Sequence, residues 1–256
     1  MGLIALAYGV ACYLFFFAVF LYFVVFVGGD ALGAATAGVA PFLGSVKTVD
    51  AVAARNVFAP PAVQNIALLL LFGVSHSVMA RASFKRAWTK IIPKPCERST
   101  YVLTASLVLV AIFHLWRPMP AVIWSATGLW SALLLIGYFI GVATVLLSTF
   151  MINHFDLFGL KQVWARFKNT EFKHDNFRTP FLYAVVRHPL YLGFLILVWT
   201  TPMMTAGHLL FAAGMSIYIF VAIGYEERDL IAHFGEEYHR YMQRVPSILP
   251  FGGGKN

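Results

Sequence analysis

Two polar clusters near the end of the sequence combine residue types that can bind and orient a small charged molecule. The first is Arg187-His188-Pro189-Leu190-Tyr191 and the second is Glu226-Glu227-Arg228. Proline is favoured in the first turn of a helix, and backbone N–H groups at a helix start attract carboxylates or phosphates. Glu226 instead suggests a cationic or hydroxyl-bearing ligand. Taken alone, the first cluster is better explained as a proline kink at the membrane interface, so the case depends on both clusters together.

Histidines at two other places are candidates for proton transfer. His154 follows a long apolar run and comes two residues before Asp156, with phenylalanines on both sides. Buried polar groups need partners, so we expect this pair either to line a pocket or to form a capping network at a helix end. His76, near the end of another apolar run, can contact a substrate or simply cap a helix. Ionisable side chains at membrane depth are costly and tend to be functional.

The composition places the chain in a membrane. Of its 256 residues, 60% are hydrophobic and only 12% are charged, whereas soluble domains carry roughly 25% charged residues. The net charge of +8 does not indicate nucleic acid binding, because the basic residues lie in short loops between apolar runs. The two cysteines form neither a disulfide framework nor a metal set, and no metal site is predicted.

The apolar runs predict an all-α integral membrane protein with about six transmembrane helices, since a span needs about 20 apolar residues. The last two spans form a tight hairpin, followed by a short amphipathic helix that carries Tyr238. If the hairpin folds back, the two polar clusters meet at one membrane surface. The expected spans are 4–27, 62–80, 99–116, 122–151, 182–200 and 205–225.

The basic residues predict how these spans are oriented. With six spans, 16 of the 19 Lys and Arg residues fall on the side that carries both termini. The positive-inside rule places that side in the cytoplasm, and with it the polar clusters. The Gly/Ala-rich 28–61 segment is then either a flap half inserted into the membrane or, as we favour, a flexible outer loop. We expect one domain over residues 1–256, with a C-terminal core at 178–251.

The order of motifs in this core resembles a family of membrane enzymes. RHPLYLG, an apolar hairpin, EE and then FGEEYHRYMQRVP is similar to the isoprenylcysteine carboxyl methyltransferase superfamily. Three further segments, HSVMAR, ERSTYVLTASLVL and NHFDLFGLKQVW, resemble the NnrU-related branch, and within it the bacterial methanethiol S-methyltransferases. The resemblance implies S-adenosylmethionine as cofactor, S-adenosylhomocysteine as product, and a bacterial inner-membrane location with a cytoplasmic active site.

The resemblance also implies roles for particular residues. It implies methyl transfer to a small thiol, with methanethiol giving dimethyl sulfide. Our first candidate for the base is His154, oriented by Asp156, with His76 and Tyr238 as second choices. The implied cofactor contacts are Phe177, Arg178, Tyr183, His188, Pro189, Leu190, Tyr191 and Glu226.

Two alternative functions follow from the same resemblance. One is methylation of a larger, lipid-like substrate of the prenylcysteine type. Against it, Ala222 stands where those enzymes place an arginine for the substrate carboxylate. The other is a membrane factor that retains the fold without catalysis. The oligomeric state is left open by the sequence.

Overall fold

Five helices of the computed structural model are long and apolar enough to cross a membrane, which confirms the predicted all-α membrane fold. The structure describes residues 2–30, 32, 47–50, 60–172 and 177–250. The long helices are α1 (Gly2–Val27), α3 (Pro61–Ala80), α5 (Glu97–Leu115, preceded by the 3-10 turn η2, Lys94–Cys96), α6 (Gly128–Ile152) and α11 (Ala206–Phe234).

The fifth predicted span, 182–200, is not one helix. It consists of a single turn, α9 (Leu182–Val185), a break at residues 186–188, and the short helix α10 (Pro189–Trp199). Val186 and His188 leave the helical conformation, and proline disfavours a helical residue before it. With 11 residues α10 is about 16 Å long, which is well short of a hydrocarbon core of about 30 Å. The site residues of the first polar cluster therefore sit at a helix start.

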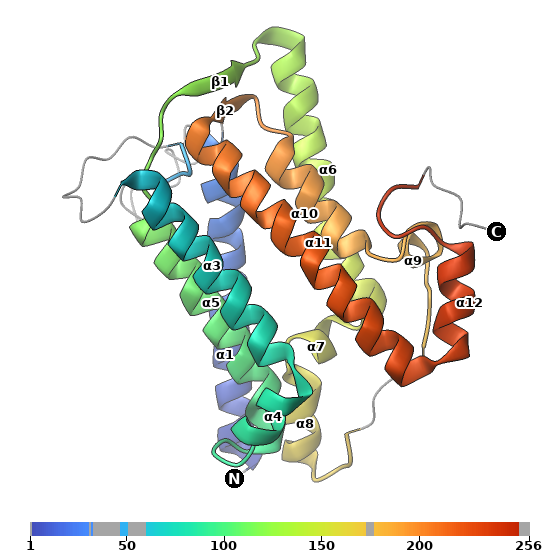
Figure 1. Ribbon diagram of the computed structural model, residues 1–256. Coiled ribbons are helices and arrows are strands. Elements are labelled where there is room, and N and C mark those ends of the chain that lie inside the picture. The colour runs from blue at the N-terminus through green and yellow to red at the C-terminus, as the bar shows by residue number, and fades with distance from the viewer. Residues whose placement is uncertain (1, 31, 33–46, 51–59, 173–176, 251–256) are drawn as a thin grey trace.

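The helices form two neighbouring groups, α1 with α3 and α5, and α6 with α10 and α11 (Figure 1). Aromatic side chains from both groups fill the space between them, including Phe23 and Phe26 of α1 and Phe211 of α11. Within the second group, α6 and α10 approach so closely that a Cβ atom on Gly193 would lie 2.8 Å from the Val145 backbone nitrogen. The bundle is thus held by aromatic packing and close helix contacts.

A two-stranded antiparallel ribbon closes one end of the bundle (Figure 1). Strand β1 (Val122–Ser125) pairs with β2 (Met203–Thr205), which forms the tip of the predicted α10–α11 hairpin. The prediction that residue 122 begins a transmembrane helix was wrong, since α6 begins at Gly128. Val122, Ile123 and Trp124 are residue types that favour strands, and β2 provides a partner for them.

Short helices gather at the other end of the bundle. They are α4 (Ala82–Trp88), α7 (His154–Leu157), α8 (Leu160–Lys168) and, beyond the end of α11, α12 (Glu236–Arg244) (Figure 1). In α12, Tyr238 and Tyr241 are buried while its charged residues face outward, which confirms the predicted amphipathic helix after the hairpin. Most of the predicted 28–61 loop lies outside the described residues.

Candidate functional site

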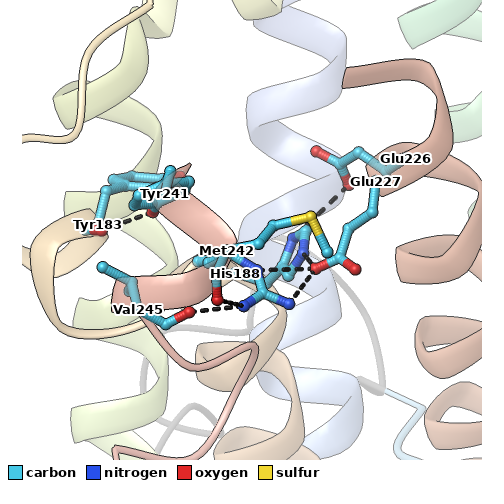
Figure 2. A network of polar contacts seen from close by, with 8 residues as sticks. Tyr183, His188, Glu226, Glu227, Tyr241, Met242 and Val245 are labelled. Carbon is cyan, nitrogen blue, oxygen red and sulfur yellow. Dashed lines mark hydrogen bonds and ion pairs between the residues drawn. The ribbon is translucent and has the colours of Figure 1, made fainter. Parts of the chain in front are cut away.

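The two polar clusters meet at the end of the bundle opposite the ribbon, as predicted (Figure 2). Arg187 donates to the Glu227 carboxylate from Nε at 2.9 Å and from Nη2 at 2.7 Å. Nε2 of His188 lies 2.9 Å from the same Glu227 oxygen. Arg187 and His188 come from the break before α10, and Glu227 comes from α11. This network fixes the start of α10 against the polar end of α11.

The segment after α12 closes this network from a third direction. Nη1 of Arg187 donates to the carbonyls of Met242 and Val245. The backbone N–H groups of Arg187 and His188 donate to the carbonyls of Pro246 and Ser247, at 2.9 and 3.0 Å. These two N–H groups, expected to be open to a ligand, are therefore occupied. The first turn of α10 still presents the N–H groups of Leu190 and Tyr191, which lie outside the helix's own hydrogen-bond ladder.

Glu226 differs from Glu227 in its exposure. Its side chain is 45% exposed, against 16% for Glu227, and its Oε2 is 4.0 Å from His188 Nδ1. The carboxylate also interacts with the side chains of Tyr191 and Tyr218. Glu227 is thus paired with Arg187, and Glu226 is the more exposed of the two acids.

Aromatic rings from three segments pack beside the network. Phe177 lies against Phe234, Tyr238 and Tyr241, with ring centroids 5.0 to 5.8 Å apart. The Tyr241 hydroxyl donates to the Tyr183 carbonyl at 2.5 Å, and burial raises the pKa of Tyr241 to about 12. Burial also raises the pKa of Tyr238. The structure thus places the predicted site residues Phe177, Tyr183 and Tyr238 in one group, whereas Arg178 is exposed.

His154 is buried, but its contacts differ from those expected. Its Nε2 lies 2.8 Å from the Tyr13 hydroxyl and its Nδ1 lies 2.8 Å from the Thr149 hydroxyl. Asp156 instead accepts from Gln162 Nε2 at 2.7 Å, so the expected His154–Asp156 pair does not form among the described contacts. Burial lowers the pKa of His154, which favours the neutral ring. The structure therefore favours the capping network over the pocket for this segment.

His76 lies on α3 in an aromatic environment. Its ring stacks on Phe72, with centroids 5.2 Å apart, and contacts Tyr101 of α5 and Tyr218 of α11. The Tyr101 hydroxyl donates to the His76 carbonyl at 3.4 Å. His76 lies on α3 and Tyr218 on α11. Further along, Arg81, directly after α3, forms a 3.3 Å ion pair with Asp229 of α11. His76 is thus close to the same end of α11 as Glu226.

Four residues at this end of the bundle were not assigned a role from the sequence. Arg187 and Glu227 were noted within their motifs, and their adjacency to His188 and Glu226 was the signal that could have identified them. Tyr101 and Tyr218 carry no comparable signal, because single tyrosines in apolar helices are common at membrane interfaces. Only the packing of α3, α5 and α11 shows that they face His76.

Taken together, the fold and site define a multi-pass α-helical membrane protein with a polar, ligand-accessible end. Within that class, the chain belongs to the methanethiol S-methyltransferase family. It is 47% identical over 246 residues to methanethiol S-methyltransferase 2 of Bradyrhizobium diazoefficiens, covering 96% of this chain and 89% of the relative. It is 45% identical over 254 residues to methanethiol S-methyltransferase of Mycobacterium tuberculosis, covering 97% and 96%.

A more distant similarity extends to another kind of membrane protein. The chain is 30% identical over 185 residues to Nurim of Pan troglodytes, covering 69% of this chain and 70% of that protein. No family model and no solved structure matches the chain.

Proposed function

We propose that this protein transfers a methyl group from S-adenosylmethionine to methanethiol and so produces dimethyl sulfide. The observation that carries this proposal is the similarity, over nearly the whole chain, to several proteins named methanethiol S-methyltransferase. The finer resemblance to isoprenylcysteine carboxyl methyltransferases agrees with a methyl donor of this type.

The residues around Glu226 fit such a donor. The N–H groups of Leu190 and Tyr191, at the start of α10, suit a carboxylate. Glu226 suits an amino group or a ribose diol, because hydrogen bonds to an ionised acid are strong. The rings of Phe177, Tyr183 and Tyr191 suit an adenine face or a sulfonium cation. We therefore assign the donor to the core at 178–251, with Arg178 at its edge and Pro189 fixing the helix start.

Once bound, the donor supplies an electrophilic methyl group, and the protein must position and activate the acceptor. It must align the acceptor sulfur in line with that methyl group and keep water away. It must also remove the thiol proton, because a small alkanethiol is mostly protonated at neutral pH. Arg187, His188 and Glu227 position the donor site rather than react, since their charged groups are already engaged with each other. We place this site at the cytoplasmic membrane face, on the side that carries the basic segments.

The test is product analysis with purified protein. We expect dimethyl sulfide in the headspace when methanethiol and S-adenosylmethionine are supplied together, and none when either is omitted. A parallel reaction contains a prenylcysteine analogue. Methylation of that analogue without dimethyl sulfide would replace our proposal with the lipid-like alternative. Absence of both products, together with no S-adenosylhomocysteine binding by calorimetry, would favour a non-enzymatic membrane factor.

A further inference from the structure

The imidazole of His76 has a buried nitrogen without a partner. Its Nδ1 is shielded from solvent, and none of the described residues forms a hydrogen bond with it. Buried polar atoms in native structures are nearly always bonded, so an exception needs an explanation. With its proton on Nε2, neutral His76 presents an acceptor lone pair at Nδ1. Such a lone pair can accept a hydrogen bond, and then a proton, from a molecule bound beside it.

The surroundings of this nitrogen indicate which kind of molecule it would accept. The rings of Phe72, Tyr101 and Tyr218 stand around His76 with centroids 4.8 to 6.1 Å from its own, and we call these four residues the His76 cage. They come from three helices, α3, α5 and α11. Aromatic rings offer apolar faces and favourable contacts to sulfur. The cage therefore suits a small, apolar molecule that carries one weak hydrogen-bond donor, which describes an alkanethiol.

Packed side chains connect the His76 cage with the proposed donor site. The His188 ring lies 5.7 Å from Tyr191, and Tyr191 packs in the same cluster as Tyr218. Tyr218 contacts His76 directly. The cage therefore neighbours the proposed donor site, and in-line transfer requires acceptor and donor to be neighbours.

His154, our first candidate from the sequence, has no ring nitrogen that lacks a hydrogen-bond partner. Both of its ring nitrogens already face hydroxyl groups, one from Tyr13 and one from Thr149. A neutral ring can donate to one hydroxyl and accept from the other, which satisfies it completely. To act as a base, His154 would first have to break a hydrogen bond in a buried site. His76 needs no such step.

We propose that the His76 cage is the thiol-binding site and that His76 is the base of the reaction, an inference that rests on the methyltransferase function proposed above. The S–H bond of the alkanethiol breaks, and its proton moves to Nδ1 of His76. The sulfur electron pair forms the new S–CH3 bond, and the bond between the methyl group and the sulfonium donor breaks. Its electron pair remains on the donor sulfur, so the donor leaves as a neutral thioether, and His76 becomes an imidazolium that releases its proton afterwards.

The first experiment compares His76→Gln with the matched variant His154→Gln in single-turnover methylation across pH. For His76→Gln we expect a rate about 10²- to 10⁴-fold lower at neutral pH, the usual loss of a general base. This defect shrinks as the pH approaches the pKa of the thiol, because the substrate then arrives as thiolate. For His154→Gln we expect the ratio of its rate to the wild-type rate to stay constant with pH. S-adenosylhomocysteine affinity, measured by calorimetry, stays near wild type in His76→Gln and shows that this variant is folded.

The second experiment detects the cage without turnover. In a Cys12→Ala, Cys96→Ala background, His76→Cys is treated with methyl methanethiosulfonate, which adds a methylthio group of methanethiol's size to a cysteine. We expect mass spectrometry to show labelling that excess dimethyl sulfide slows. Val78→Cys, on the same helix but 47% exposed as valine, is the matched control, and dimethyl sulfide leaves its labelling rate unchanged.

Several results would overturn the inference. In the kinetic experiment, these are a wild-type rate in His76→Gln, a His76→Gln defect that is constant with pH, or a His154→Gln defect that shrinks with rising pH. In the labelling experiment, it is labelling of His76→Cys that dimethyl sulfide does not slow. These failures are distinct from failure of the proposed function. If dimethyl sulfide forms but the cage is not protected, only the assignment of the thiol site is lost. If no product forms, the labelling result still reports whether a site of this size exists.

Discussion

Two adjacent glutamates of α11 have different environments and therefore different roles. Glu227 shares one carboxylate oxygen with Arg187 and His188, and its side chain is largely buried. Removing one member of such a pair leaves a buried charge uncompensated, so Glu227 holds the structure together. Glu226 is half exposed and interacts with tyrosines that are neutral at physiological pH. The sequence shows only that these two acids are adjacent, and the structure shows that their environments differ.

The variant Glu226→Gln tests this division of roles. It removes the charge and keeps the shape, so we expect a folded protein that binds S-adenosylhomocysteine about 10- to 150-fold more weakly. This range corresponds to the loss of about 1.5–3 kcal/mol from a hydrogen bond to a charged group. Calorimetric titration measures the affinity, and thermal unfolding in detergent checks the fold. The matched variant Glu227→Gln should lower the unfolding temperature instead. Wild-type affinity in folded Glu226→Gln would remove Glu226 from the site.

At the scale of helices, the contact of α6 with α10 holds the proposed donor site in place. Ideal Cβ atoms on Gly141 and Gly193 would lie 2.7 to 3.0 Å from backbone atoms of the opposite helix, which cannot move aside as a flexible side chain can. The two helices therefore pack backbone to backbone, as small residues allow in membranes. Since α10 begins at the Arg187–Glu227 network, a shift of α10 displaces the site.

We predict that Gly193→Ala destabilises the protein by about 1–3 kcal/mol, the usual cost of overpacking, and weakens S-adenosylhomocysteine binding as α10 moves. The control is Gly224→Ala on α11, where an added Cβ meets nothing within 4 Å. That variant should be neutral, or stabilise by about 0.5–1 kcal/mol because alanine favours a helix interior. Denaturation in detergent micelles measures both. Equal stability of the two variants would contradict the close packing of α6 and α10.

At the scale of the whole molecule, a buried polar group at the ribbon end holds the segment around Asp50 against the α10–α11 hairpin. The Asp50 carboxylate accepts from the Thr205 hydroxyl at 2.5 Å and lies 3.2 Å from His208 Nδ1. His208 Nε2 faces the Val198 carbonyl at 3.1 Å, so both ring nitrogens face acceptors. The Asp50 carboxylate thus connects the segment at residue 50 to the first turn of α11 through two side chains.

The variant Asp50→Asn is expected to destabilise the protein by about 3–5 kcal/mol, as breaking a buried charged pair does. Because Asp50 lies at the end opposite the donor site, the folded fraction should keep wild-type affinity for S-adenosylhomocysteine. Thermal unfolding and calorimetry on the same preparation separate the two effects. A variant as stable as wild type would show that the Asp50–His208 contact does not hold this end together.

Orientation in the membrane is a second prediction at this scale. In the Cys12→Ala, Cys96→Ala background, we expect Lys90→Cys and Thr170→Cys to react with a membrane-impermeant maleimide from the cytoplasmic side. Ile123→Cys, in the ribbon at the opposite end, should react from the outer side. Inside-out vesicles compared with intact cells provide the measurement. Labelling of positions 90 and 170 from different sides would rule out this orientation.

The sequence allows the long helices, the hairpin and the meeting of the two polar clusters to be predicted, because these depend on apolar runs and motif order. Pro189 predicts a kink or helix start at this position, but the sequence does not predict the carbonyls that Arg187 reaches more than 50 residues further along the chain. It does not predict the partners of His154 either, since Tyr13 lies 141 residues away. The same is true of His76, whose cage is formed by tyrosines on two other helices.

The bonds from Arg187 to the segment after α12 have a consequence for the order in which the protein matures. A chain emerges from the ribosome N-terminal end first, at about 5–20 residues per second, so all the long helices are synthesised before Val245, Pro246 and Ser247. Until these residues arrive, the Arg187 side chain and the N–H groups of residues 187 and 188 lack the carbonyls that hold them. Chains that end before Val245 therefore lack the carbonyls that hold the start of α10 in its final position.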